Sequence, residues 1–166
     1  MRELSRSREI TVRSVEEGTV LSKDTYVYDA EYLHLFIWNA KAKEIVGAYR
    51  LGLADKICEK FGVRGLYTHT LFKFNENLTD KILPGIELGR SFVRPEYQKA
   101  FQPLLYLWKG IGTFISRNPQ YVNLFGPVSI TADYKDSSRN MLLRSLELSN
   151  FANDLAHLVK PRKKPA

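Results

Sequence analysis

Cysteine is nearly absent from this sequence: Cys58 is the single one among 166 residues. One thiol excludes an intramolecular disulfide and a cysteine-based metal cluster, and it favours a reducing compartment such as the cytoplasm. The three histidines, at 34, 69 and 157, lack metal-ligand spacing, and neither HExxH nor CxxC occurs. We therefore expect no metal site, and we expect each histidine to lie in packing or at the surface.

Long hydrophobic runs are also missing, and no segment approaches the roughly 20 apolar residues of a membrane-spanning helix. The arginines near the N-terminus have no apolar stretch behind them, so this segment does not resemble a secretory signal. Neither a GxSxG elbow nor a GxxxxGK(S/T) loop is present. We expect a cytoplasmic protein, with peripheral contact to the inner membrane through the basic C-terminal run as a minor alternative.

Positive charge is in excess, and the net charge of +7 predicts attraction to anions. Nucleic acid, anionic lipid, a phosphate-bearing cofactor and an acidic carrier protein all fit this charge. The nine tyrosines and nine phenylalanines interleave with core positions and do not decorate a basic strip, which disfavours a nucleic-acid partner. A nucleic-acid-binding module is still the simplest alternative explanation of the charge.

Apolar residues make up 44% of the chain, enough for the core of one domain. Their spacing predicts strands over 31–38, 44–51, 66–74, 86–93 and 121–130. It predicts helices over 55–61, 103–117, from 137 or 138 onward, and 151–159. The segments 39–43 and 75–84 are expected to be polar connections. Within the helix 103–117, Gly110 and Gly112 indicate close packing against a sheet.

This order of elements indicates an α/β (α+β) fold, with a mixed, mostly antiparallel central sheet flanked by helices. We expect three segments: an N-terminal arm over 1–24, the domain over 25–160, and a basic tail over 161–166.

Glu87 and Arg90 stand three apart in the predicted strand 86–93. Gly89 between them could host a bulge, which would turn Arg90 to the side of Glu87. A carboxylate beside a guanidinium within a sheet is costly unless the pair is used or hydrogen-bonded. On these residues alone, a structural ion pair is favoured over a functional site by roughly two to one.

The turn 94–102 leads into the predicted helix at Pro103. A helix start offers unpaired N–H groups and a positive dipole end, which suit a phosphate. Arg94 and Lys99 add positive charge nearby. Every α-helix begins in this way, so the turn by itself indicates only a suitable place for an anion.

Five stretches in a fixed order carry a resemblance to a known family. They are YDAEYLHLFIW (28–38), IVGAYRL (45–51), ELGRSFVRPEY (87–97), LYLWKGI (105–111) and LFGPVS (124–129). Together they resemble the ornithine-lipid-type N-acyltransferases, a hemolysin-like branch of the GNAT superfamily that is distantly similar to acyl-homoserine-lactone synthases. The resemblance covers about residues 26–162.

The resemblance implies a GNAT-like sheet and the transfer of a fatty acyl group from acyl carrier protein to the amine of an amino acid, ornithine or glycine. It implies Glu87 as the general base. Arg50 and Arg90 would orient the substrate carboxylate or hold Glu87 in place. Asp29 and Glu31 are candidates for binding a cationic amino-acid side chain, although the acidic cluster is thinner than is usual in the family.

The acyl donor would be held after the strand 86–93. By the resemblance, the binding residues are Gln98, Lys99, Ala100, Phe101, Gln102 and Leu104. This segment lacks the glycines of the usual Q/R-x-x-G-x-G/A signature. The departure favours the phosphopantetheine of acyl carrier protein as the donor over acyl-CoA, with no tightly bound cofactor.

Two alternatives to a carrier-dependent enzyme remain. One is an N-acetyltransferase that uses acetyl-CoA, and the other is a non-catalytic lipid-binding or ligand-binding domain. Family members usually continue beyond the end of this chain, and the module also occurs fused to a glycerolipid O-acyltransferase. The chain therefore fits one domain of a longer protein.

Overall fold

The computed structural model describes residue 11 and residues 29–130 and 134–162. The strands are β1 (Leu33–Asn39), β2 (Glu44–Leu53), β3 (Phe72–Phe74), β4 (Gly85–Val93), β5 (Asn123–Phe125) and β6 (Val159–Pro161). The α-helices are α2 (Ala54–Phe61), α3 (Thr68–Leu71), α4 (Glu76–Ile82), α5 (Gln102–Arg117), α6 (Asp136–Asn150) and α7 (Asn153–Ala156). Short 3-10 turns are η1 (Asp29–Glu31), η2 (Val63–Gly65) and η3 (Pro95–Tyr97). The predicted arm 1–24 lies outside the described residues except for Thr11, so the segment boundaries stay a prediction.

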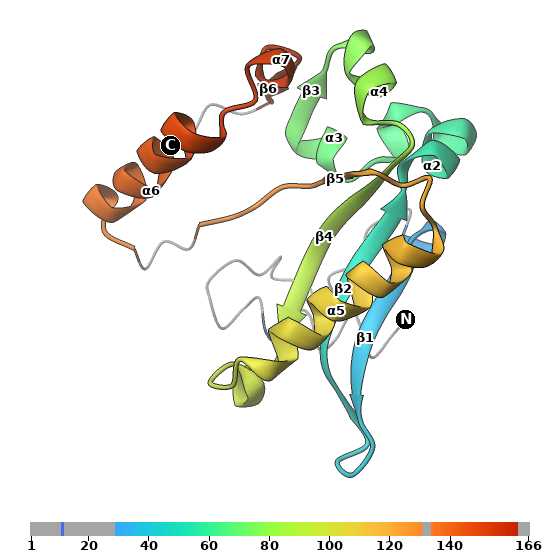
Figure 1. Ribbon diagram of the computed structural model, residues 1–166, viewed down its shortest axis with the longest axis vertical. Coiled ribbons are helices and arrows are strands. Elements are labelled where there is room, and N and C mark those ends of the chain that lie inside the picture. The colour runs from blue at the N-terminus through green and yellow to red at the C-terminus, as the bar shows by residue number, and fades with distance from the viewer. Residues whose placement is uncertain (1–10, 12–28, 131–133, 163–166) are drawn as a thin grey trace.

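A four-stranded sheet in the order β1-β2-β4-β5 organises the described chain (Figure 1). The pairs β1–β2 and β2–β4 are antiparallel, whereas β4 and β5 are parallel. A separate two-stranded sheet joins β3 to β6 in antiparallel fashion. With helices beside the larger sheet, the predicted α/β fold with a mixed, mostly antiparallel sheet is confirmed.

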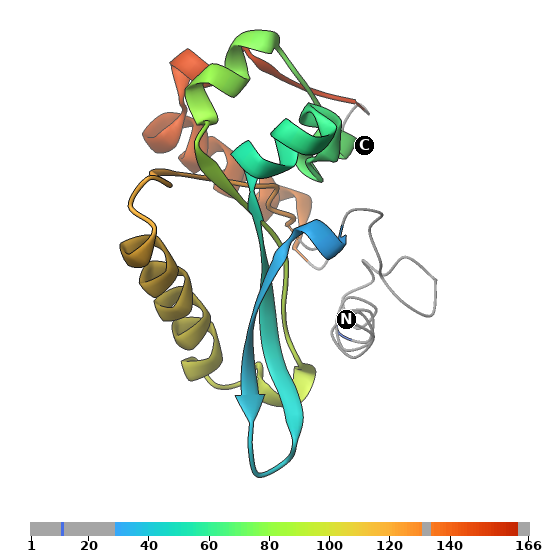
Figure 2. The same ribbon diagram turned by 90° about the vertical axis from the view of Figure 1, so that its right-hand side faces the viewer.

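The two faces of the larger sheet differ in chemistry. One face is apolar and is covered by α5, as Figure 2 shows. Its buried cluster is centred on Leu51, Ile86 and Tyr121. Gly110 lets the helix approach, because a Cβ at this position would lie 2.9 Å from the methyl carbons of Leu35. Strand residues alternate between faces, so Arg50 and Glu87, each one position from these apolar residues, lie on the opposite face.

Helix α2 begins one residue earlier than predicted, and it ends as predicted at Gly62. This glycine has a φ of 65°, a left-handed conformation that residues with a side chain rarely adopt. The helix packs Ile57 into a buried cluster with Tyr32 and Leu66. That cluster lies at one end of the sheet face that carries Glu87. It holds Tyr32 in position above this face.

Two predictions between α2 and β4 are wrong. The predicted strand 66–74 is a helical turn, α3, followed by only three extended residues, because backbone N–H groups of the turn bond to Glu87 and not to a neighbouring strand. The predicted loop 75–84 contains α4. This helix is capped by the side chain of Asn75 and buries Leu78 and Ile82, four residues apart, against Leu158.

Two predictions in the C-terminal third are also wrong in extent. The predicted strand 121–130 pairs with β4 only over Asn123–Phe125. At Gly126 the chain passes against the backbone of β4, where a Cβ would lie 1.9 Å from the carbonyl oxygen of Leu88. The predicted helix 151–159 is reduced to α7, because Val159–Pro161 instead pairs with β3. That strand ends at Pro161, the first residue of the predicted basic tail and one residue beyond the predicted end of the domain.

The predicted helix that starts near 137 or 138 is present as α6, although no side chain caps its first turn. Its apolar residues Met141, Leu142 and Leu146 are exposed. The helix therefore adds nothing to the core of the described chain.

Candidate active site

Glu87 is the centre of a buried polar cluster on the face of the sheet opposite α5. Its side chain is 2% exposed. Oε1 accepts from the backbone N–H of Thr68 at 2.5 Å and from the hydroxyl of the same residue. Oε2 accepts from the backbone N–H of Tyr67 at 3.1 Å and from the hydroxyl of Tyr32. Four donors match the acceptor capacity of one carboxylate group.

Tyr32 reaches Glu87 by lying over β2. The position beneath its ring is Gly52, where a Cβ would lie 2.4 Å from Cε1 of the ring. The hydroxyl also accepts from the N–H of Tyr67 at 3.0 Å and lies 3.2 Å from the carbonyl oxygen of Gly65. Burial first, and then the charge of Glu87, raise the pKa of Tyr32 far above the ordinary phenol value. The phenol is therefore a fixed hydrogen-bond donor to the carboxylate.

Arg50 is buried beside this cluster and forms an ion pair with Asp29. Both side chains are almost completely excluded from solvent. The guanidinium carbon lies 4.2 Å from the ring centroid of Tyr32 and 4.9 Å from that of Tyr67. Two aromatic faces and one carboxylate thus surround the buried cation. Arg50 is placed to orient these aromatic side chains around Glu87.

Arg90 occupies the predicted bulge in β4. Ala48 of β2 pairs with Phe92 of β4, and Arg50 pairs with Gly89. Between these two pairings β4 has one residue more than β2, which is a β-bulge. The residue with a left-handed φ, 46°, is Arg90 and not the glycine. Its guanidinium carbon lies 4.6 Å from the ring centroid of Tyr67.

The structural ion pair between Glu87 and Arg90, which the residues alone favoured, does not form between these two described side chains. Hydrogen bonds from Tyr32, Tyr67 and Thr68 take its place on the carboxylate. The two residues are instead linked through Tyr67, whose backbone bonds to Glu87 and whose ring faces Arg90.

The predicted donor segment lies between the far end of β4 and the start of α5 (Figure 1), and it borders a hollow. The hollow has a volume of about 430 Å³ and is lined by Val93, Gln98, Lys99, Ala100, Phe101 and Leu104. Five of the six predicted donor-binding residues are in this lining, and Gln102 is the exception. The side chain of Gln98 donates to the carbonyl oxygen of Val93 at 2.8 Å and ties the turn to the strand.

Strand β5 leaves β4 directly beside Glu87. The parallel pairing ends at Glu87 and Phe125, whereas β4 stays paired with β2 as far as Val93. From Leu88 onward, the edge of β4 therefore has no β5 residue opposite it. The divergence places the buried carboxylate at one end of this edge and the hollow at the other.

The two acids predicted to bind a cationic substrate are already paired. Asp29 is bound to Arg50, and Glu31 accepts from Lys60 at 2.8 Å. The sequence reasoning missed Tyr32 and Tyr67 as parts of the site. No local pattern identifies them, because they contact Glu87 from 55 and 20 residues away in sequence.

Among residue 11 and residues 29–130 and 134–162, no three His, Cys, Asp or Glu side chains gather as metal ligands. Within the same residues, no helix is long and apolar enough to cross a membrane.

Comparison with known proteins yields one family and two relatives. The family model described as acetyltransferase (GNAT) domain matches residues 8–109. A glycine N(alpha)-acyltransferase of Bacteroides thetaiotaomicron is 37% identical over 172 residues, which cover 97% of this chain and 50% of that protein. A protein of the same name from Phocaeicola vulgatus is 34% identical over 174 residues, covering 98% of this chain and 53% of that protein. The chain thus spans about half the length of these curated relatives. No solved structure matches it.

Proposed function

Because the chain belongs to the acetyltransferase (GNAT) domain family, we propose that it is an N-acyltransferase that transfers a fatty acyl group from a phosphopantetheine thioester to the amine of a small amino acid. The observation that carries this proposal is the buried Glu87 cluster, which lies where β5 diverges from β4. A carboxylate for proton transfer and a stretch of β4 that no β5 residue pairs with are thereby next to each other.

In the proposed reaction, the nitrogen of the acceptor forms a bond to the thioester carbonyl carbon, and the carbon–sulfur bond then breaks. The ammonium group of the acceptor must first lose a proton, which Glu87 would accept through a water molecule. The Tyr67 N–H is shared between Oε2 of Glu87 and the hydroxyl of Tyr32, at 3.1 and 3.0 Å. This N–H can stay bonded to Tyr32 when Oε2 takes up a proton. The nitrogen gives up a second proton as the amide forms, and this proton goes to the leaving thiolate, which departs as the free thiol of the carrier.

A neutral acceptor side chain fits the cluster better than a cationic one. Asp29 and Glu31 are engaged by Arg50 and Lys60, so neither is available to an ornithine ammonium group. Arg90 is partly exposed beside the cluster and is our candidate for the acceptor carboxylate. Glycine has a carboxylate and an amine and no side chain, and the two relatives are named for it.

The hollow at the start of α5 is our candidate for the donor. Its lining includes Lys99 and the apolar side chains of Phe101 and Leu104, which suit a phosphate and a pantetheine arm. The net charge of +7 favours an acidic carrier protein as the source of that arm. Acyl carrier protein is therefore the proposed donor, with acyl-CoA as the alternative.

The test is acyl transfer by the full-length protein with acyl carrier protein as donor and glycine or ornithine as acceptor, followed by mass spectrometry of the product. We expect N-acylglycine, and a loss of at least about 100-fold in kcat for Glu87→Gln. Glu59→Gln is the matched control, because this acid is exposed on α2 and, among the described residues, pairs only with Lys56. Equal activity of Glu87→Gln and wild type would refute the role of Glu87. Turnover of acetyl-CoA alone would identify an acetyltransferase instead.

A further inference from the structure

At the other end of β4 from the donor hollow lie η2, α3, β3 and β6 (Figure 1), and these elements with the residue after β6 carry a second cluster of charge. Its basic residues are Arg64, His69, Lys73, Lys160 and Arg162. All of these except Lys160 line a hollow of about 710 Å³, together with Thr70 and Phe74. Nothing in the proposed acyl transfer uses this hollow.

The small sheet concentrates like charges. Lys73 of β3 stands directly opposite Lys160 of β6, an arrangement that destabilises a sheet. Arg162 follows β6 directly, and its backbone N–H donates to the carbonyl oxygen of Leu71 just before β3. Among the described residues, no carboxylate lies within ion-pair distance of Arg64, Lys73, Lys160 or Arg162. Within the part of the chain that the structure describes, these cations lie together without a neutralising carboxylate.

Arg162 is hydrogen-bonded to α3 at the rim of this hollow. Its backbone N–H donates to the carbonyl oxygen of Leu71 at 2.9 Å, and its Nε donates to the carbonyl oxygen of His69 at 2.7 Å. One of its terminal guanidinium nitrogens, Nη2, lies 3.0 Å from Nε2 of the His69 ring. A guanidinium fixed in this way loses little conformational entropy when an anion binds.

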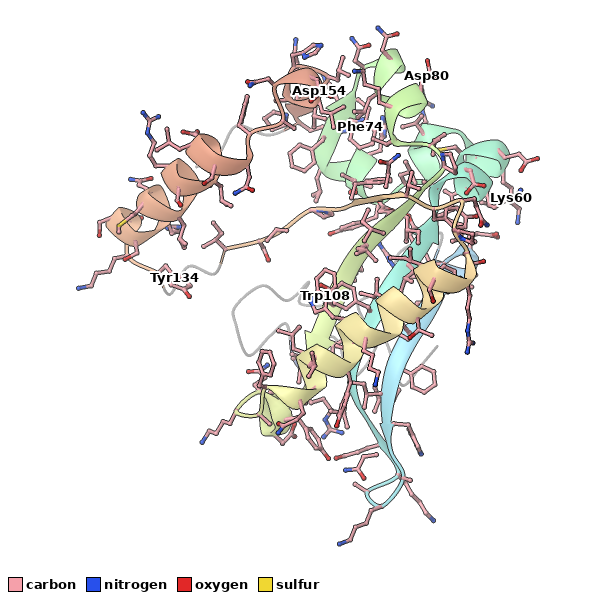
Figure 3. The ribbon with its side chains drawn as sticks, in the orientation of Figure 1. Lys60, Phe74, Asp80, Trp108, Tyr134 and Asp154 are labelled. Atoms are coloured by element: carbon pink, nitrogen blue, oxygen red, sulfur yellow. The ribbon has the colours of Figure 1, made fainter. Side chains whose placement is uncertain are left out.

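An apolar layer beneath the charges holds them in place. Phe74, labelled in Figure 3, packs on the cluster formed by Leu78, Ile82 and Leu158. The ring of His69 stands edge-on to Phe74, with centroids 5.8 Å apart. Burial, and then the charges of Arg162 and Arg64, lower the pKa of this imidazole, as expected for a strongly positive environment. The apolar contacts of Phe74 offset the repulsion between the basic side chains of this cluster.

We propose that this hollow is a binding site for a phosphate group. A carboxylate needs one guanidinium, whereas several converging cations match an anion that carries more than one charge. The volume lies in the range of small-molecule sites. Two sources supply this chemistry, a soluble phosphate compound and the head group of a phosphate-bearing lipid.

The hollow adjoins the Glu87 cluster through a single helical turn. The backbone N–H groups of Tyr67 and Thr68 bond to Glu87, and the next two residues, His69 and Thr70, line the hollow. The two sites are thus neighbours with different ligands. The phosphate proposal does not depend on the proposed acyl transfer.

Binding is measured with two probes on the full chain: inorganic pyrophosphate by calorimetry, and phosphatidylcholine vesicles with and without phosphatidic acid by flotation. We expect wild type to bind at least one probe, and the double variant Arg64→Gln/Lys73→Gln to bind it about tenfold less tightly or worse. Without any ligand, Lys73→Gln should raise the melting temperature, because its repulsion with Lys160 is removed. The matched control is Lys41→Gln, which removes one exposed charge in the β1–β2 turn.

Binding of pyrophosphate would support a soluble ligand, and binding of acidic vesicles without pyrophosphate would support a lipid head group. Binding of neither probe by wild type would overturn the proposal, as would an equal loss in Lys41→Gln. Tighter binding of an oligonucleotide, weakened alike in all variants, would also overturn it. Glu87→Gln should keep phosphate affinity. A wild type that transfers acyl groups but binds neither probe would therefore reject this site alone.

Discussion

The hydroxyl of Tyr32 donates to the carboxylate of Glu87 from 55 residues away in sequence. The contact crosses β2 at Gly52, the position that leaves room for the phenol ring. Because the same hydroxyl accepts from the N–H of Tyr67, one side chain fixes both the carboxylate and a donor to it. Tyr32 is a positioning residue for Glu87.

Tyr32→Phe should weaken both stability and transfer. The change leaves Glu87 with three donors in a buried site, which should lower the free energy of unfolding by about 1–3 kcal/mol. We expect kcat to fall while KM for the acyl donor is unchanged, because the donor hollow is distant from the ring. Urea unfolding and steady-state kinetics measure the two effects. An unchanged kcat would show that Glu87 keeps its position without the phenol.

Gly52→Ala should displace the ring of Tyr32, because the new methyl group would lie 2.4 Å from it. We expect a loss of about 1–3 kcal/mol in the free energy of unfolding, together with reduced transfer. Gly112→Ala in α5 is the matched control. No atom lies within 4 Å of a Cβ there, and alanine should stabilise the helix by about 0.5–1 kcal/mol. Equal effects of the two changes would contradict this account of Gly52.

The reactivity of the Cys58 thiol should depend on the charge of Glu87. Burial, followed by the charges of Glu87 and Asp55, raises the pKa of its thiol to about 11. Alkylation at neutral pH should therefore be slow, since the thiolate is the reacting form. Glu87→Gln removes one of these causes and should speed the reaction, whereas Glu59→Gln should leave it near the wild-type rate. An unaltered rate in Glu87→Gln would mean that the charge does not reach the thiol.

Acidification should destabilise the protein through His69. Its pKa lies below the ordinary value of 6.5, so the unfolded chain binds the proton more readily than the folded one. The contribution of this group is present in full above pH 6.5 and is lost as pH falls through the lower folded value. The charged groups that act on the ring are Arg162 and Arg64, and Lys73 lines the same hollow. NMR titration of the imidazole measures the shift, and Arg162→Gln should move the pKa upward. A titration at the ordinary value would contradict this picture.

The strand that carries Glu87 and the helix α5 could be predicted from the sequence, because their apolar periodicity agrees with their final environment. The bulge was predicted from Gly89, although the strained conformation belongs to Arg90. Two glycines of α5 show the limit of such reasoning. Gly110 packs against Leu35 as predicted, whereas nothing lies near Gly112. The residue type is the same, and only the distance to the sheet distinguishes the two positions.

The donors to Glu87 could not be predicted, because their role depends on contacts across the fold. Thr68 lies in a segment whose alternating pattern favours a strand, yet its backbone turns to bond to the carboxylate. The short helix α4 was missed because two buried residues and one Asn75 cap are too brief a signal. The early end of β5 follows from the contact of Gly126 with Leu88, which has no local signature.

Helix α3 has a thermodynamic consequence. Its first N–H groups hold Glu87, and its next side chains border the basic hollow. Any anion that shifts this turn changes the orientation of the carboxylate, and linkage requires the effect to be mutual. If the anion alters the affinity for the amine acceptor by some factor, the acceptor alters the affinity for the anion by the same factor. A single turn of four residues separates the two sites, so its backbone is the path along which such a coupling would run.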